Sequence, residues 1–349
     1  MRRDCLLALT FAGLLASSAP AAQSKPILIK VVILTTFESG ASAGTGTRAG
    51  EFGLWADRLP LRRRLSVPGI EGRVLLSDDG VLGVVTGMRA RPRESVTALI
   101  LDRELDVSHA YWIVAGIAGV DPRAGSIGSA AWALYVVDAD PVFEMDDREI
   151  PEDWSEGLWS LGTDRPGVKG SAPGSSDMVW KLNPGLVNWA YALTRDIPLA
   201  DTADLKAARA GYSREPAALK PPTVFLGDEV STTRFWHGER RTQWARDWMK
   251  LWTDGAGTFA MTACEDQGIL DVLGLFARAG RIDNRRVLVL RTASNYSREA
   301  DGADPSVHFA HGGAGAAFEA AYRVGSPVVK ALVAGWAEYA TTPPEGKNP

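Results

Sequence analysis

The stretch ILIKVVILTTF, residues 27–37, is an almost continuous run of β-branched and other apolar residues. Such a run is typical of a strand that is buried on both faces, as in the centre of an α/β sheet. A loop rich in glycine, serine and threonine, ESGASAGTGTRAGEF, begins directly after it at residue 38. Because loops at the ends of such strands often carry binding residues, we expect part of a functional site here.

Outward from this strand, strand-like and helical segments alternate along the chain. Residues 73–88 predict a hairpin, or two successive strands, joined at Asp79-Gly80, and a helix follows with Pro92 at its start. Further strands are expected at 111–120, 130–143, 223–230 and 285–295, a helix at 241–252, and two closing helices at 314–324 and 326–340. This alternation predicts an α/β fold.

Residues 144–222 differ from the rest, because they are acidic and contain several Pro and Trp residues. Two short helices are expected inside this segment, at 182–196 and 203–212. We interpret 144–222 as an insertion that covers the sheet of a single domain spanning residues 23–349.

Residues 1–22 have the pattern of a secretory signal peptide. A basic start at Arg2 and Arg3 is followed by ten apolar residues, LLALTFAGLL, and by the small residues of Ala19-Pro20-Ala21. Ten apolar residues are too few to cross a bilayer, which needs about 20. We therefore expect an exported, periplasmic protein. Its mature chain would keep a single cysteine, Cys264, and so could form no intrachain disulfide.

The charge balance argues against a nucleic-acid partner. The net charge is −4, it becomes −5 once Arg2, Arg3 and Asp4 are removed, and no basic block is present. The sequence also lacks HExxH, CxxC, GxSxG, P-loop and GxGxxG motifs, and its four histidines are scattered. We expect neither a metal nor a resident cofactor.

The segment CEDQGIL, residues 264–270, places two carboxylates side by side where a helix with a buried face begins. Two interpretations remain open from the residues alone. One of the carboxylates complements the N-terminus of the helix, which would stabilise it by about 0.3–1 kcal/mol. Alternatively, one of them holds a ligand.

Several segments, in this order along the chain, resemble the nucleoside phosphorylase superfamily, and the whole mature chain resembles the purine nucleoside permease family built on that fold. They are GVLGVVTGMRARPRESVTALIL, YWIVAGIAGVDPRAGSIG, VFLGDEVSTTRFW, CEDQGIL and RTASNYS. The resemblance implies a three-layer α/β/α fold with a mixed central sheet and an inserted helical and loop segment.

The resemblance also implies roles for residues of a nucleoside pocket. Glu265 matches a glutamate that accepts hydrogen bonds from the ribose 2′ and 3′ hydroxyls, which suits a carboxylate because it is acceptor-only. Phe235 matches an aromatic residue that stacks on the base, with Trp236 beside it. His237 could reach the sugar 5′ hydroxyl, although a lone histidine after two aromatic residues is more often structural. Met261 is assigned to the same pocket.

Three further residues are weaker candidates. Asn295 lies where many superfamily members carry an aspartate that protonates the purine N7; an asparagine can donate to N7 but cannot give up a proton. Arg89 follows a glycine turn and could bind phosphate, although the strand arginine of several phosphorylases is missing. Glu38 ends the first strand, where related hydrolases carry acids that activate water. Each residue has an alternative interpretation. Asn295 could be a turn residue, Arg89 could be a solvated charge ahead of a helix, and the alignment that selects Glu38 could be displaced along the chain.

Two functions follow from the resemblance. The first is an exported purine nucleoside-binding protein that supports nucleoside uptake together with a membrane transporter, because a chain without a spanning helix cannot conduct nucleosides alone. The alternative is an enzyme, an N-glycosidase or a phosphorylase with phosphate as co-substrate, that splits purine nucleosides into base and pentose. Members of the superfamily often form oligomers, so an oligomer is compatible with either function.

Overall fold

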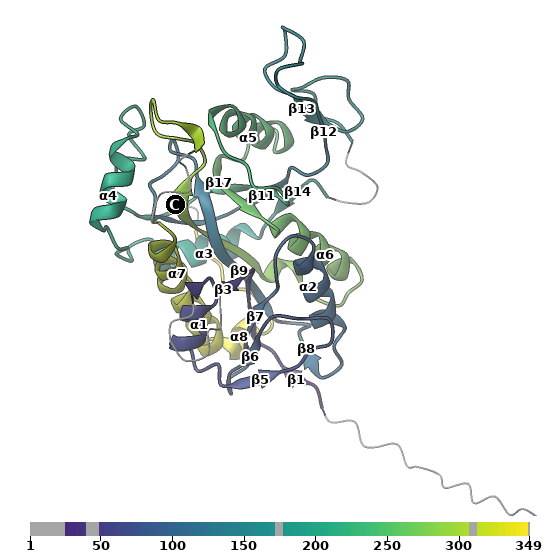
Figure 1. The fold of residues 1–349 in the computed structure, drawn as a ribbon. Helices are drawn as coiled ribbons and strands as arrows, with labels where there is room; N and C mark the ends of the chain where they lie inside the picture. Colours follow the sequence, from purple (N-terminus) through teal and green to yellow (C-terminus); the bar gives the residue numbers. More distant parts are fainter. Residues whose placement is uncertain (1–24, 40–48, 172–176, 307–312, 348–349) are drawn as a thin grey trace, which may run out of the picture.

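The computed structural model describes residues 25–39, 49–171, 177–306 and 313–347. The expected signal peptide lies outside these ranges. Figure 1 shows a twisted central sheet with helices on both of its faces. Within the described residues, the main sheet has twelve strands, some parallel and some antiparallel to their neighbours. The expected mixed α/β fold is therefore confirmed.

The centre of the sheet is β2 (Val31–Thr35), and all five of its residues are buried. β2 runs parallel to β7 (Val81–Val85) on one side and to β9 (Tyr111–Val120) on the other. Burial between two strands and two helical layers explains why the run contains no alternation of polar residues. The expected strand is interrupted at Ile29 and Lys30, and the short β1 (Ile27–Leu28) before the break pairs with β8 (Leu105–Asp106) instead.

The other strands extend the sheet in both directions from this centre. The order is β14-β11-β16-β17-β9-β2-β7-β6-β5, with β18 paired to β9, β10 to β18 and β15 to β10. Their bounds are β5 Arg63–Leu65, β6 Val74–Leu76, β10 Ala130–Trp132, β11 Tyr135–Asp138, β14 Val179–Lys181, β15 Val224–Leu226, β16 Asp228–Thr232, β17 Phe259–Cys264 and β18 Val287–Tyr296. Two short hairpins stand apart from the sheet, formed by β3 (Glu38–Ser39) with β4 (Ala49–Gly50) and by β12 (Val142–Glu144) with β13 (Leu158–Ser160).

The ten-residue strand β9 is where the sheet branches. It pairs in parallel with β2 along its first half and with β18 along nearly its whole length, and its last residues pair antiparallel with β17. The carboxyl ends of β2 and β18 therefore meet next to the second half of β9. This convergence leaves room for a site beyond the end of β2.

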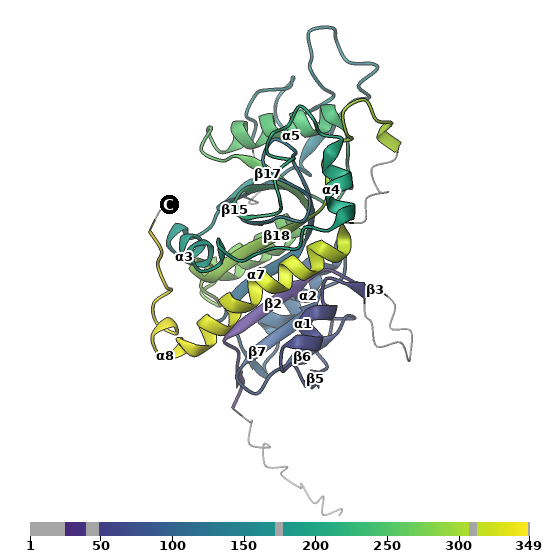
Figure 2. The ribbon, with the colours of Figure 1, turned by 90° about the vertical axis from the view of Figure 1, so that its left-hand side faces the viewer.

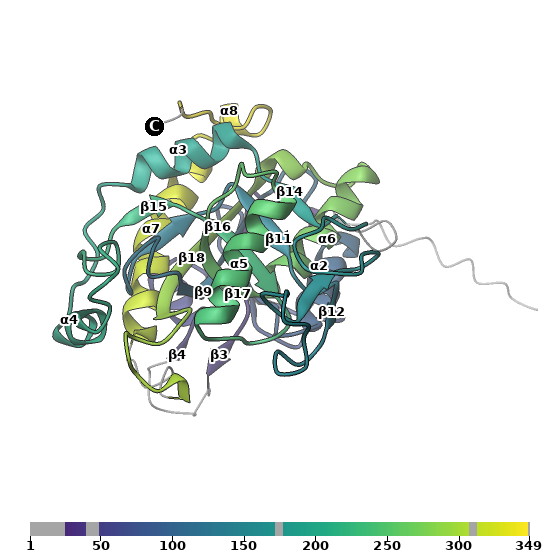
Figure 3. The same cartoon turned by 90° about the horizontal axis from the view of Figure 1, so that it is seen from above.

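Two helical layers cover the sheet. α7 (Ala314–Ala334) crosses one face against β9 and β18, and α1 (Gly53–Arg58) and α3 (Pro184–Thr194) pack beside it (Figure 2). α2 (Arg91–Leu101) packs on α6 (Asp266–Arg278), and α5 (Glu239–Trp252) lies against β16 and β17 (Figure 3). The remaining helices are α4 (Ala203–Ala210), η1 (Asn284–Arg286) and α8 (Trp336–Tyr339). Within the described ranges, none of the helices has both the length and the apolar character needed to traverse a bilayer.

The chain breaks where a single strand is expected at 130–143. It forms β10, then turns at Ala133 and Leu134 to continue as β11 with different partners. The cause is Asp228, whose Oδ1 accepts from the backbone N–H groups of Leu134 at 3.0 Å and Tyr135 at 2.8 Å. These bonds hold the bend between the two strands, and propensity alone does not reveal them.

The two closing helices expected at 314–324 and 326–340 are instead mostly one. α7 continues through Pro327, and only the four residues of α8 lie beyond it. A methyl group at Gly325 would lie 2.5 Å from the ring of Trp55, so the glycine lets α1 pack closely at this point. Tertiary packing therefore outweighs the local preference for a break at the proline.

The segment 144–222 contributes to several parts of the molecule. Its hairpin, β12 with β13, projects from the body of the protein (Figure 1). β14 joins the edge of the main sheet antiparallel to β11, and α3 belongs to the helical layer around α7. Both helices expected in this segment are present, as α3 and α4.

Candidate functional site

A cavity of about 270 Å³ lies where the ends of β2, β7, β16, β17 and β18 meet next to β9. This is the place where sheets of this kind leave space for a ligand. The walls come from loops and strand ends that are far apart in the sequence. The lining residues are Thr36, Phe37, Glu51, Met88, Ile117, Ala118, Gly119, Arg234, Phe235, Trp236, Thr262, Ala263, Cys264, Glu265, Arg291, Ser294, Asn295 and Ala314.

Glu265 lines this cavity between the end of β17 and the start of α6. It occupies the N-cap position of α6 but makes no side-chain capping hydrogen bond, and its φ of 77° places it in the left-handed region. Its Oε1 accepts from the backbone N–H of Arg89 at 2.8 Å. Burial raises the pKa of Glu265 to about 7, opposed in part by this N–H and by Arg291. The side chain of Glu265 thus faces the cavity and does not cap α6 through a hydrogen bond.

The second carboxylate of the pair, Asp266, is directed elsewhere. It is fully buried at the first position of α6 and binds the guanidinium of Arg291 through both of its oxygens, with Nε donating to Oδ2 at 2.8 Å. The two adjacent acids therefore differ in surroundings. Glu265 meets the cavity, while Asp266 holds the strand β18 to the helix α6.

The two aromatic candidates lie on the loop between β16 and α5. Phe235 lines the cavity at its rim, and 68% of its surface is exposed. Trp236 also lines the cavity, but its ring is packed edge-on against Trp244 on α5 and tilted against Phe259 on β17. Phe235 is free to lie on a flat ligand, whereas Trp236 is a fixed part of the wall.

Asn295 lines the cavity from the end of β18. Its Nδ2 donates to the backbone carbonyl of Tyr296 at 2.9 Å, and its Oδ1 accepts from the hydroxyl of Ser294 at 2.9 Å. Gly119 on β9 lies opposite, and a Cβ there would come 3.0 Å from Nδ2. The amide is thus held in one orientation on the cavity wall, together with the neighbouring hydroxyl.

Four of the residues selected from the sequence lie outside the lining. Met261 is buried in an apolar cluster with Val120 and Ala260, and the cavity lining on β17 begins with the next residue. His237 is nearly buried, with Nε2 3.6 Å from a carboxylate oxygen of Glu299. The other two residues are Arg89 and Glu38.

The side chain of Arg89 is exposed, and only its backbone reaches the site, through the hydrogen bond to Glu265. Glu38 is paired with the guanidinium of Arg73, with Nε donating to Oε2 at 2.7 Å. Glu38 is also in register with Gly50 in the hairpin of β3 and β4, and this hairpin brings the next residue, Glu51, to the cavity. The acid that the Gly/Ser/Thr loop supplies to the cavity is Glu51.

Glu51 is almost completely buried at the cavity wall. Its Oε2 accepts from the backbone N–H of Thr36 at 2.7 Å and from the hydroxyl of Thr36 at 2.8 Å, and its Oε1 accepts from the N–H of Ile117 at 2.8 Å. Burial raises the pKa of Glu51, and nearby Arg291 and these hydrogen bonds oppose the shift. The carboxylate is therefore fixed in position and desolvated.

Arg291 is the centre of a buried ionic cluster behind the cavity. Besides Asp266, its nitrogens lie 3.8 Å from an oxygen of Glu51 and 3.8 Å from an oxygen of Glu229. Glu229 is fully buried, and burial together with the charge of Asp266 raises its pKa well above the ordinary value. Within the described residues, no group of His, Cys, Asp and Glu side chains is arranged to hold a metal ion.

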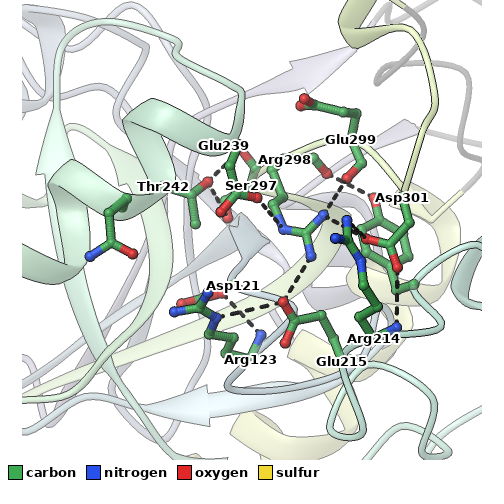
Figure 4. A network of polar contacts seen from close by, with 12 residues as sticks. Asp121, Arg123, Arg214, Glu215, Glu239, Thr242, Ser297, Arg298, Glu299 and Asp301 are labelled. Carbon is green, nitrogen blue, oxygen red and sulfur yellow. Dashed lines mark hydrogen bonds and ion pairs between the residues drawn. The ribbon is translucent and has the colours of Figure 1, made fainter. Parts of the chain in front are cut away.

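A second polar network fixes the chain that follows Asn295 (Figure 4). Arg298 is buried and pairs with Glu215 and Glu239, at 2.8 Å in each case. The backbone carbonyl of Ser297 accepts from the hydroxyl of Thr242 and from the N–H of Gly238, both at 3.0 Å. This network ties the end of β18 to the N-terminus of α5, and so holds together the strand end that carries Asn295 and the loop that carries Phe235.

Glu51 and Arg291 were not predicted from the sequence. Glu51 lies near the end of the Gly/Ser/Thr loop that was expected to carry part of the site, so its signal was an acid in that loop. Arg291 is part of the segment RTASNYS, and an arginine inside an otherwise apolar strand is a signal for a buried ionic partner.

A comparison with protein-family models finds one match, to purine nucleoside permease (NUP), over residues 28–344. Among curated proteins, the chain is 26% identical over 259 residues to a probable purine nucleoside permease of Schizosaccharomyces pombe, covering 71% of this chain and 74% of that protein. It is 27% identical over 249 residues to the purine nucleoside permease of Candida albicans, covering 69% of this chain. That match spans 61% of the length of the Candida protein.

Two solved structures resemble the fold with a TM-score of 0.50. One is the 5′-methylthioadenosine/S-adenosylhomocysteine nucleosidase of Neisseria meningitidis, with 12% sequence identity over 86% of this chain and 99% of the other. The second is the futalosine hydrolase of Helicobacter pylori, with 14% identity over 86% of this chain and 98% of the other. At such low identity these likenesses show the fold alone.

Proposed function

The chain belongs to the purine nucleoside permease family, and from this premise we propose that it binds purine nucleosides in the described cavity and supports their uptake. The observation that carries the proposal is that Glu265 and Phe235, 30 residues apart in the sequence, line the same cavity. A carboxylate and an aromatic ring on one cavity are suited to the two ends of a nucleoside.

In this proposal, the carboxylate of Glu265 accepts hydrogen bonds from the 2′ and 3′ hydroxyls of the ribose. Its Oε1 is already held by the Arg89 N–H, so the group needs no reorganisation to meet the diol. The base lies between the exposed ring of Phe235 and the wall that carries Asn295, whose neighbour Ser294 supplies a further hydroxyl.

Export through a signal peptide and delivery of the nucleoside to a membrane partner are parts of the same proposal. The N-terminal pattern of residues 1–22 supports the first, and the names of the two curated relatives support the second. His237 belongs to the wall behind the aromatic loop in this proposal. Met261 anchors β17, the strand that ends directly before Glu265, in the apolar core.

The test is calorimetric titration of the purified chain with inosine, adenosine, guanosine and uridine. We expect saturable binding of at least one purine nucleoside, and weaker binding of uridine. Glu265→Gln should lose the binding, whereas Glu94→Gln, an exposed carboxylate on α2, should not. If none of the nucleosides binds to the folded protein, the proposal fails.

A second candidate function, hydrolysis of the glycosidic bond, is favoured by the position of Glu51. This buried acid faces the cavity in addition to the diol-binding acid, and its raised pKa makes it a better proton acceptor than an ordinary carboxylate. In the reaction, a water molecule forms a bond to C1′ and loses a proton to Glu51. The bond from C1′ to N9 breaks, and the base leaves with the electron pair, assisted by a hydrogen bond from Asn295.

The two functions are separated by incubating the protein with inosine and measuring free hypoxanthine by chromatography, with and without orthophosphate. Release without phosphate would establish hydrolysis, and Glu51→Gln should then abolish release while inosine still binds. Binding without any release would leave the transport-related function alone. Release that depends on phosphate would identify a phosphorylase and would contradict the role given to water.

A further inference from the structure

The acidic and basic side chains on the cavity wall differ in how far their charges are compensated. Within the described residues, two carboxylates, Glu51 and Glu265, and two guanidinium groups, Arg234 and Arg291, line the cavity. The two signs are equal in number, but their partners differ. What a ligand experiences depends on which of these charges are already compensated.

Both cations are paired with carboxylates that lie outside the lining. Arg291 is held by both oxygens of Asp266, with Glu229 close behind. Arg234, at the rim, donates to Glu144 of the hairpin β12–β13 at 2.6 Å. Each guanidinium therefore offers little uncompensated positive charge to a molecule in the cavity.

The two carboxylates are only partly compensated by positive charge, because Glu51 shares the single cation Arg291 with Asp266 and Glu229. Glu51 accepts from two backbone N–H groups and one hydroxyl, and Glu265 accepts from one backbone N–H. Arg291 approaches Glu51 no closer than 3.8 Å and is already bound to Asp266. The cavity thus retains a negative field in surroundings where water screens it poorly.

We propose that the cavity accepts purine nucleosides only without a charged phosphate, and that Glu51 and Glu265 together exclude nucleotides and orthophosphate. This inference rests on the proposed function and specifies its substrate class. A neutral nucleoside presents hydroxyl donors to the two carboxylates, whereas a phosphate presents only acceptors and like charge. Arg291 lines the cavity, but its donors are already committed to Asp266 and to the backbone carbonyls of Ile117 and Cys264.

The experiment compares three ligands at pH 8, where both carboxylates carry more of their charge. They are the purine nucleoside that binds, its 5′-monophosphate, and its neutral 5′-O-sulfamoyl ester, which has nearly the same bulk as the phosphate. We expect the monophosphate to bind more weakly than the neutral ester by about 100-fold or more, as repulsion in a poorly screened site requires. Orthophosphate at 10 mM, roughly the upper range for a free co-substrate, should not change the affinity for the nucleoside.

A charge-neutralising variant tests whether the carboxylates cause the weaker binding of the monophosphate. Glu51→Gln should reduce the difference between the monophosphate and the neutral ester by about tenfold or more, because one of two repelling charges is removed. Glu71→Gln removes the same charge from an exposed side chain that does not line the cavity and should change nothing. Circular dichroism and thermal unfolding confirm that both variants are folded.

The outcomes separate this inference from the proposed function. If no nucleoside binds, the proposed function fails, whatever the phosphate does. If the nucleoside and its monophosphate bind equally well, or if orthophosphate competes, the function stands and the exclusion is wrong. If the neutral ester is rejected as strongly as the monophosphate, the cavity selects by size, and the role assigned to the carboxylates is overturned. The ligand comparison decides the question even if Glu51→Gln does not fold.

Discussion

The backbone N–H of Arg89 donates a hydrogen bond of 2.8 Å to Oε1 of Glu265, across 176 positions of sequence. The bond joins the turn that precedes α2 to the start of α6, and these two helices pack on each other. Arg89, with a φ of 64°, and Glu265, with a φ of 77°, are both in the left-handed region. Two residues in an unfavourable backbone conformation thus meet at one hydrogen bond, which is typical of a functional site.

Replacing Glu265 should separate binding from stability. We expect Glu265→Ala to weaken nucleoside binding by about 100-fold or more, because two hydrogen bonds to a charged acceptor are lost. Stability should change by about 1 kcal/mol or less, since the side chain makes no capping bond to α6. Titration calorimetry and urea unfolding measure the two effects. A large loss of stability with intact binding would restore the capping interpretation.

Glycine at the same position provides a matched control for the backbone. Because Glu265 is left-handed, Glu265→Gly should be more stable than Glu265→Ala by about 1 kcal/mol, while both lose binding to the same extent. Urea unfolding of the two variants under identical conditions measures the difference. Equal stability would mean that the left-handed conformation carries no strain.

Nucleoside binding should strengthen as the pH rises. Burial raises the pKa of Glu265 to about 7, and only the ionised group accepts from both hydroxyls of the ribose. The affinity should therefore fall by up to about tenfold for each pH unit below 7 and level off above it. Titrations between pH 5.5 and 8.5 test this, with Phe235→Ala as a control that weakens binding but keeps the profile. A flat profile would exclude Glu265 as the group that binds the diol.

Ionisation of Glu265, which should strengthen binding as the pH rises, should at the same time lower the stability of the fold. The folded protein keeps Glu265 protonated up to about pH 7, whereas the ordinary pKa is 4.5. Its contribution to the free energy of unfolding is therefore largest below pH 4.5 and is lost as the pH rises to about 7. Glu265→Gln should remove this part of the pH dependence, and the difference between the two urea-unfolding profiles measures it. Identical profiles would contradict the raised pKa.

The exposed ring of Phe235 should matter for binding alone. Phe235→Ala should weaken nucleoside binding by about 5- to 100-fold, the range that loss of one stacking partner produces. Its stability should change by less than about 0.5 kcal/mol, because 68% of the residue is exposed. Phe143→Ala, an exposed aromatic on the projecting hairpin, serves as a control that should bind normally. If the two variants behave alike, Phe235 does not contact the base.

Arg291 should be the most sensitive position of the buried cluster. Arg291→Met leaves Asp266, Glu229 and Glu51 without their shared cation, and breaking such a buried pair costs about 3–5 kcal/mol. The loss should become smaller at pH 5 than at pH 8, because the unpaired carboxylates can then take up protons in the folded state. Urea unfolding at both pH values measures it. An equal loss at both would mean that packing, and not charge, is responsible.

Sequence patterns predicted the sheet well because burial on both faces leaves a clear signal. The strand 111–120 and the helices at 241–252 and 203–212 were located to within two residues. The points at which strands break were harder to predict from the sequence. The division between β10 and β11 depends on the side chain of Asp228, which lies about 93 residues further along the chain and bonds to Tyr135. Long-range bonds of this kind leave no local pattern.

The site was predictable only in part for a related reason. Glu265, Phe235, Trp236 and Asn295 come from segments with recognisable motifs, and all four line one cavity. Glu38 was predicted and Glu51 was not, because a strand end is visible in a sequence, whereas the return of the chain through β3 and β4 is not. The importance of Arg291 likewise depends on three acids supplied by other segments.

Gly116, in the middle of β9, has no space for a side chain. A methyl group there would lie 2.2 Å from Nη1 of Arg291 and 2.5 Å from Oε1 of Glu51. A lineage could therefore enlarge residue 116 only after one of those two side chains had been shortened or displaced. This single glycine thus offers a marker for sorting related proteins: those with a larger residue at the equivalent position should also have lost the acid or the arginine.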